Sequence, residues 1–150
     1  MRDDPADMRL VPVRDNPDAA PFLYRLLEER PRENWISHSG LPTPGDHENF
    51  VRSHPFRCWY LIERDGGYVG ALEVTDRNEI GVSILKAYQR QGLAKEAMTF
   101  FMQTHKPLPA IPAVRSGNWL ANIAMSNIGS KIFFSELGFF PVQETWKQHD

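Results

Sequence analysis

The stretch that decides the fold is EIGVSILKAYQRQGLA, residues 79–94. Its first seven residues are mostly apolar and predict a strand, and a polar loop follows them. Beyond the loop, apolar residues recur at helical spacing at Leu93, Ala97, Phe100 and Phe101. A helix that begins directly after a loop presents unpaired backbone N–H groups and the positive end of its dipole. The stretch therefore predicts an anion site at the start of this helix.

The loop residues suit a phosphate ligand. Gly92 lets the backbone approach a ligand closely, Ala94 leaves room beside it, and the side chains of Gln89, Arg90 and Gln91 add hydrogen-bond donors. The spacing is neither that of a Walker loop nor that of a three-glycine dinucleotide fingerprint. The order of strand, Gln89-x-x-Gly92-x-Ala94 loop and helix instead resembles the pyrophosphate loop of the GNAT superfamily of acyl-CoA-dependent N-acetyltransferases.

A second motif follows in the expected order. Residues 119–123 predict a short buried strand, and Asn127 then stands at the N-cap of a helix whose C-cap is Gly138. The pattern from Asn127 through Ser130 and Phe133 to Gly138 and Phe139 is similar to the second motif of the same superfamily. The two motifs together identify the chain as a member, and this resemblance implies a central mixed α/β sheet with helices on both faces.

The remaining pattern predicts the elements that this topology requires. They are a strand at 8–13, a helix at 19–29 capped by Asp18, a short helix at 45–53, strands at 59–63 and 68–75 around a turn at 64–67, and a strand that starts at 139. The resulting order, β-α-α-β-β-β-α-β-α-β, is that of the superfamily core. We expect residues 1–150 to form a single N-acetyltransferase domain.

The resemblance also implies a cofactor and the residues that hold it. Acetyl-CoA would be the acyl donor, bound in the gap between the central strand and the next motif. The implied cofactor residues are Ser83, Ile84 and Leu85 for the pantetheine and thioester, Gln89, Arg90, Gln91, Gly92, Leu93 and Ala94 for the pyrophosphate, and Asn127, Ser130 and Phe133 for the rest of the groove.

Amide formation requires a neutral amine, so an alkylammonium with a pKa near 10.4 must first lose a proton. Glu79 begins the central strand, where many relatives place a glutamate base, although a solvated carboxylate at a strand end is an equally good interpretation. Asn122 occupies the position of a glutamate in relatives that acetylate protein N-termini, and we expect it to orient substrate or water. His38, in the loop between the first two helices, is the third candidate because imidazole titrates near neutrality.

One position departs from the superfamily pattern. The helix residue that is often a tyrosine, acting as acid toward the CoA thiolate, is Phe134 in this chain. Phenylalanine has no proton to give, so release of the thiolate would rely on water, another group, or the low basicity of the thiolate itself.

Composition and charge argue against several classes of partner and location. The chain has 150 residues and a formal net charge of −2, which gives no general attraction to nucleic acid or anionic membrane. No apolar run approaches the roughly 20 residues of a membrane span, and the first residues lack a secretory apolar region. Cys58 is the single cysteine, so we expect neither disulfides nor a cysteine-based metal site, and a cytoplasmic location.

The acceptor is the least determined feature. Residues 35–59 are rich in aromatics and prolines and carry charges of both signs, which favours a small polar amine such as a nucleotide-linked amino sugar. Three alternatives stay open: a protein N-terminal or ribosomal-protein acetyltransferase, a non-catalytic CoA-binding module, and a nucleotide-phosphate binder of another fold. A strand at 142–146 with an exposed edge would suit association into a homodimer.

Overall fold

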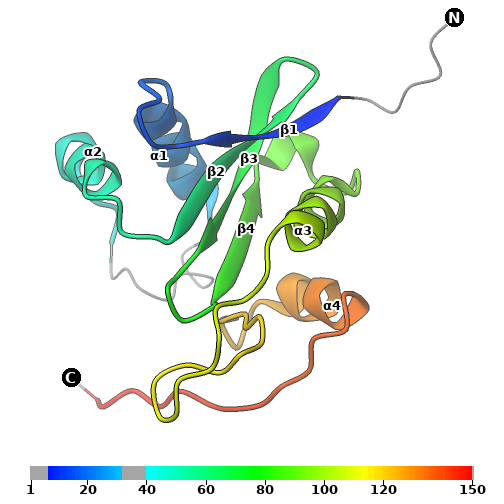
Figure 1. The fold of residues 1–150 in the computed structure, drawn as a ribbon. Helices are drawn as coiled ribbons and strands as arrows, with labels where there is room; N and C mark the ends of the chain where they lie inside the picture. Colours follow the sequence, from blue (N-terminus) through cyan, green and yellow to red (C-terminus); the bar gives the residue numbers. More distant parts are fainter. Residues whose placement is uncertain (1–6, 32–39, 150) are drawn as a thin grey trace, which may run out of the picture.

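The computed structural model describes residues 7–31 and 40–149, and in these ranges a four-stranded antiparallel sheet forms the centre (Figure 1). The strands are β1 (Met8–Pro12), β2 (Cys58–Arg64), β3 (Gly67–Val74) and β4 (Ile80–Ile84), in that spatial order. The helices are α1 (Ala19–Glu29), α2 (Pro44–Arg52), α3 (Leu93–Thr104) and α4 (Ile128–Glu136), with a short 3₁₀ turn at Lys86–Tyr88 before α3. Helices α1 and α2 lie on one side of the sheet, and α3 and α4 lie on the other.

Two apolar layers hold the sheet between the helices. Because strand residues alternate between faces, neighbouring residues of β3 contribute to opposite layers. The layer toward α1 and α2 contains Leu23, Leu26, Val51, Leu61 and Ala71, and the layer toward α3 and α4 contains Leu72, Val74, Met98, Phe101 and Phe134. Phe101 and Leu72 have no exposed surface, so the sheet is well packed at its centre.

The predicted helices and the first four strands are confirmed with boundary shifts of one or two residues. Two details are wrong. The Asp18 side chain makes no capping bond, and the Asn16 side chain instead accepts a hydrogen bond from the Asp18 backbone N–H at 3.0 Å. On α3, Phe100 is 44% exposed, because the buried face of the helix passes through Met98 and Phe101.

The predicted strand at 119–123 is reduced to one parallel bridge between Glu79 and Leu120. The Ile80 N–H donates to the Leu120 carbonyl at 2.8 Å, and no ladder continues beyond it in the described residues. Trp119, Ala121 and Ile123 pack their side chains on the α3–α4 layer. The alternating apolar pattern is therefore explained by side-chain burial, without backbone pairing along β4.

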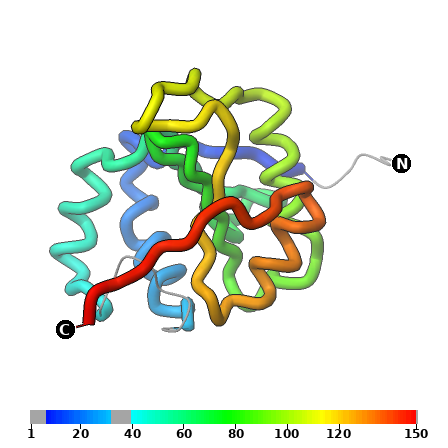
Figure 2. The backbone as a smooth tube through the Cα atoms, turned by 90° about the horizontal axis from the view of Figure 1, so that it is seen from below, coloured from blue at the N-terminus to red at the C-terminus, as the bar shows by residue number. Residues whose placement is uncertain are grey.

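The predicted strand after Gly138 is also absent from the described residues. The C-cap of α4 is Leu137 rather than Gly138, and Gly138 follows it with a φ of 92°. Beyond it, residues 140–149 pair with no strand of the described chain and cross the face of the molecule that Figure 2 shows. Pro141 removes one backbone donor from this segment, and Val142 and Trp146 are 63% and 86% exposed. Dimer formation through this segment stays a prediction.

Cys58, at the start of β2, is half-buried against the α3–α4 layer rather than fully enclosed. In the parts of the chain that the structure describes, no helix combines the length and apolarity needed to cross a membrane.

Asn78 fixes the loop that carries residues 106–118 to the start of β4. Its side chain has no exposed surface, and its amide nitrogen donates to the carbonyls of Leu108 and Ser116 at 3.0 and 2.8 Å. Its amide oxygen accepts from the Leu108 N–H at 2.8 Å. The backbone of Asn78 also has a positive φ of 65°, which asparagine tolerates better than most residues.

We expect Asn78→Ala to lower the free energy of unfolding by about 3 kcal/mol, because it removes three hydrogen bonds and leaves their buried partners unsatisfied. Denaturant unfolding measures this change. Arg77→Ala, at the exposed neighbouring position, should stay within about 0.5 kcal/mol of the parent. Equal stability of both variants would contradict the assigned role of Asn78.

Candidate active site

The N-terminus of α3 is an open site for an anion. Gly92, with a φ of 76°, is the N-cap, and no side chain caps the helix. The first helical hydrogen bond runs from the Glu96 N–H to the Gly92 carbonyl at 3.0 Å, so the N–H groups of the three residues between them have no partner in the helix. Arg90 also has a positive φ, 64°, which turns successive backbone groups of this loop in one direction.

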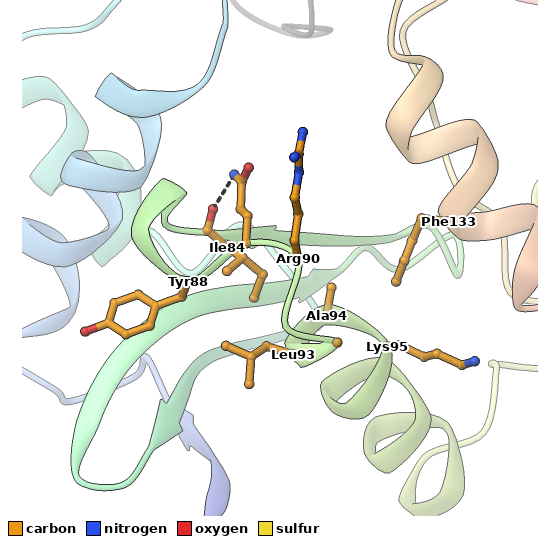
Figure 3. A pocket seen from close by; sticks show the side chains of 9 residues that line it. Ile84, Tyr88, Arg90, Leu93, Ala94, Lys95 and Phe133 are labelled. Atoms are coloured by element: carbon orange, nitrogen blue, oxygen red, sulfur yellow. Dashed lines mark hydrogen bonds between the residues drawn. The ribbon is translucent and has the colours of Figure 1, made fainter.

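An open pocket of about 210 Å³ lies against this helix end (Figure 3). It is lined by Ile84, Tyr88, Gln89, Arg90, Gly92, Leu93, Ala94, Lys95 and Phe133. The Gln89 amide nitrogen donates to the Ile84 carbonyl at 3.0 Å, which ties the loop to the end of β4. The structure thus brings most of the predicted pyrophosphate residues to one pocket, whereas Gln91 is exposed and is not part of its lining.

Lys95 in this pocket was not among the predicted residues. A cation in the first turn of a helix opposes the helix dipole unless an anion sits nearby, and this mismatch was a usable sequence signal.

Strand β4 has a free backbone edge beside the pocket. The Thr75 N–H donates to the Glu79 carbonyl and Ile80 bonds outward to Leu120, so by alternation Ile80, Val82 and Ile84 direct their backbone groups away from β3. Ser83, in contrast, pairs with Ala71 in β3. In the described residues, the free edge is therefore offered by both backbone groups of Val82 and by the N–H of Ile84, whose carbonyl accepts from Gln89. Val82 was missed because sequence alone does not show which residues of the strand face away from β3.

Leu85, the third residue predicted to hold the pantetheine through its backbone, follows this edge. Its N–H donates to the Val69 carbonyl at 2.9 Å, and its side chain is buried in the α1–α2 layer. Its backbone N–H is therefore engaged inside the sheet.

Glu79 and Asn122, both predicted from sequence, lie in direct contact where the single bridge ends. The Asn122 amide nitrogen donates to one Glu79 carboxylate oxygen, and the Thr75 hydroxyl donates to the other at 3.0 Å. Both oxygens are thus held by neutral donors, which fixes the orientation of the carboxylate without neutralising its charge. Glu79 is half-buried, so it can meet a substrate at the surface.

A second carboxylate, Glu73, lies two strand positions from Thr75 and was not predicted. It pairs with Gly81 across the β3–β4 ladder. Burial raises the pKa of Glu73, while the nearby Arg30 cation acts in the opposite direction. The sequence signal was a single acidic residue inside the apolar run of β3, between Leu72 and Val74.

Helix α4 places its predicted residues in different roles. The Asn127 side chain caps the helix by accepting from the Ser130 N–H at 3.1 Å, and Ser130 is half-buried. Phe133 lines the pocket, facing the α3 loop, whereas Phe134 is 7% exposed and packs between Phe133 and Phe139. Phe134 is therefore part of the core, and the aromatic ring at the pocket comes from its neighbour.

His38 lies outside the described residues, so its predicted role as a base stays a prediction. Within 7–31 and 40–149, no group of three or more His, Cys, Asp or Glu side chains is placed to hold a metal ion.

Comparison with known proteins was made by family model and by structure. The family model "Acetyltransferase (GNAT) domain" matches residues 7–139. No curated protein sequence matches significantly.

Solved structures with the same fold include an acetyltransferase from Thermus thermophilus, with 22% identity, a TM-score of 0.67, and coverage of 91% of this chain and 89% of that one. An aminoglycoside N-acetyltransferase in complex with CoA has 13% identity, a TM-score of 0.64, and coverage of 100% and 99%. A ribosomal-protein-alanine N-acetyltransferase from Brucella melitensis has 12% identity, a TM-score of 0.62, and coverage of 97% and 99%.

These findings overturn the alternative of a nucleotide-phosphate binder with another fold. The family model spans both sequence motifs and all four strands of the sheet, and the anion site at α3 and the free edge of β4 lie inside it. The chain belongs to the GNAT acetyltransferase family, whose members are acyl-CoA-dependent N-acetyltransferases.

Proposed function

We propose that the protein transfers an acetyl group from acetyl-CoA directly to the primary amine of a small acceptor, such as a nucleotide-linked amino sugar. One observation carries this proposal: the oriented Glu79 carboxylate and the anion site of α3 lie at opposite ends of the same strand, β4, whose backbone edge is free between them. A single extended cofactor arm can therefore be held at the loop and deliver its thioester near Glu79.

The residues at α3 fit the diphosphate of CoA. The unpaired N–H groups of Leu93, Ala94 and Lys95 would donate to phosphate oxygens, and the cations of Arg90 and Lys95 would offset their charge. Val82 and Ile84 would pair with the amide groups of the pantetheine through the free strand edge, as an added strand does. When bound, acetyl-CoA supplies the activated acyl carbonyl.

The remaining steps use groups of this chain. Glu79 would take a proton from the acceptor ammonium, directly or through water, with Asn122 and Thr75 holding the carboxylate in place. The outward N–H of Val82 is a donor for the oxyanion that forms on the carbonyl. Phe134 is buried and carries no acidic proton, so the thiolate would receive its proton from water.

A protein N-terminal acetyltransferase is the second candidate function. An aminoglycoside enzyme and a ribosomal-protein enzyme both share this fold, so the fold favours neither. Asn122 favours the small acceptor, because it provides an amide at the position where the N-terminal enzymes place a glutamate by the resemblance described above. We also propose a single domain over residues 1–150, a cytoplasmic location and a homodimer, without nucleic-acid or membrane partners, in keeping with the low net charge.

The test is calorimetric binding of CoA and acetyl-CoA, followed by thiol release across a panel of alkylamines, amino-sugar nucleotides and N-terminal peptides. Micromolar binding with release that depends on small amines would support the proposal. Release with peptides alone would select the second candidate, and binding without release by any amine would reject transfer to the classes of amine tested.

We expect Glu79→Gln to lower kcat by about 10²-fold or more, because the glutamine amide has nearly the same size and shape but cannot accept a proton. The dissociation constant of acetyl-CoA should not change. Glu136→Gln, at an exposed position on α4, is the matched control and should retain parental turnover. Unchanged turnover of Glu79→Gln would remove Glu79 as the base.

We expect Gly92→Val to weaken acetyl-CoA binding at least about tenfold, because a β-branched residue at a φ of 76° is strained and its side chain obstructs the approach of phosphate. Calorimetry measures the loss. The control is Gly45→Val near the start of α2, where a Cβ meets no atom within 4 Å and φ is not positive. Equal acetyl-CoA affinity of parent and Gly92→Val would place the diphosphate elsewhere.

A further inference from the structure

A row of polar groups crosses the sheet on the side of α1 and α2. Ala71 packs in the α1–α2 layer, and alternation places Glu73 and Thr75 of the same chain segment on that face. Across the ladder, Ala71 pairs with Ser83 and Glu73 pairs with Gly81. The Thr75 N–H donates to the Glu79 carbonyl. The row therefore joins the base candidate Glu79 to groups that the catalytic proposal does not use.

The Glu73 carboxylate lies in the space that Gly81 leaves free because it has no side chain. A Cβ built on Gly81 would stand 2.6 Å from one carboxylate oxygen of Glu73 and 3.1 Å from its carboxyl carbon. The Glu73 carboxylate thus lies over Gly81, where other residues would have a side chain. On this face of the strand, Glu79 is the neighbour on one side of Gly81 and Ser83 is the neighbour on the other. Same-face neighbours on a strand are about 6.6–7 Å apart, so one small substrate group reaches both carboxylates.

The two carboxylates differ in what holds them. Both oxygens of Glu79 accept from side-chain donors. For Glu73, burial is the largest influence and raises the pKa of the carboxyl group, while the Arg30 cation acts in the opposite direction. Arg30, the residue that follows α1, directs one guanidinium nitrogen to the Ser83 hydroxyl at 2.7 Å.

Such a carboxylate opposes folding rather than supporting it. Glu73 lies inside β3 on the same face as Ala71 of the α1–α2 layer, and a charge that is partly removed from water in this way carries a desolvation cost. Groups of this kind are typical of functional positions, where a ligand completes the pairing.

We propose that Glu73 binds the ammonium group of the acceptor and thereby selects alkylamines, which are protonated at neutral pH. This inference rests on the proposed function and adds to it a substrate class and a specificity residue. The acceptor approaches from the α1–α2 face, its ammonium contacts Glu73 above Gly81, and Glu79 lies next to it along the row. Gly81 keeps the place of the Glu73 carboxylate free.

The first experiment uses the most active alkylamine of the acceptor panel and its analogue in which a hydroxyl replaces the amine. Glu73→Gln should raise the KM of the alkylamine about 10- to 100-fold with kcat within threefold, because it removes a charge-assisted contact made on binding. The inhibition constant of the neutral hydroxyl analogue and the dissociation constant of acetyl-CoA should not change. Glu63→Gln, a carboxylate on β2 paired with Arg9, is the control and should leave KM unchanged.

A second variant tests the geometry without changing any charge. Gly81→Ala places a methyl group where the Glu73 carboxylate lies, so it should raise the KM of the same alkylamine while acetyl-CoA binding persists. An unchanged alkylamine KM in Glu73→Gln, or an equal loss of affinity for the amine and its hydroxyl analogue, would overturn the assignment. Absence of amine-dependent release in the parent protein would instead remove the proposed function, which is a separate outcome.

Stability distinguishes binding from a structural role. A carboxylate with a raised pKa in the folded state gives a free energy of unfolding that falls as pH rises from its ordinary range through that raised pKa. Of the groups facing Glu73, Arg30 after α1 and Glu79 before β4 are charged, whereas Trp59 on β2 and Gly81 and Ser83 on β4 are neutral. Glu73→Gln should therefore flatten this pH dependence and leave the melting temperature at pH 7 equal or higher. A melting temperature several degrees lower would identify Glu73 as a structural partner and overturn the proposal.

Discussion

The free edge of β4 is the constraint on which the active site depends. Strand β4 is the edge strand of the sheet: it pairs fully with β3 and only once, through Ile80 and Leu120, with the segment that follows α3 in the described chain. An unpaired strand edge is a template for another extended chain. A pantetheine arm has the extended shape and the amide groups that such an edge can pair with.

The bridge between Glu79 and Leu120 is held in place by buried contacts. Asn78 anchors the loop before it through three hydrogen bonds, and Trp119, Ala121 and Ile123 bury their side chains against α3 and α4. Residues 119–123 are thus held by the burial of their side chains, and their backbone does not pair with β4 beyond the single bridge. Separation of the two segments is therefore a stable property of the packed core.

The sequence predicted the helices and helix ends, whose signals lie in neighbouring residues. It failed where the result depends on which strands pair with each other. Gly92 and Asn127 act through the backbone of their own helix ends, so their roles at α3 and α4 follow from position along the chain. The strand at 119–123 looked identical to a paired strand because side-chain burial gives the same alternation. Val82 was missed for a related reason, since only the ladder register shows which residues of β4 face outward. Glu73 was missed because its neighbours are Gly81 on the next strand and Arg30 after α1. These residues are far apart in the sequence, so no pattern within one segment connects them.

Helix α1 connects the two halves of the site physically. Glu29 accepts a hydrogen bond from the Lys86 N–H at 2.8 Å, at the start of the turn that leads into the phosphate loop, and Arg30 contacts Ser83 at the end of β4. The end of α1 therefore contacts both the sheet face that carries Glu73 and the turn that precedes α3. Because these contacts are polar and lie at a helix end, they can adjust more readily than the apolar layers. The turn before α3 and the face of the sheet that carries Glu73 are therefore held by the same short piece of chain, residues 29 and 30.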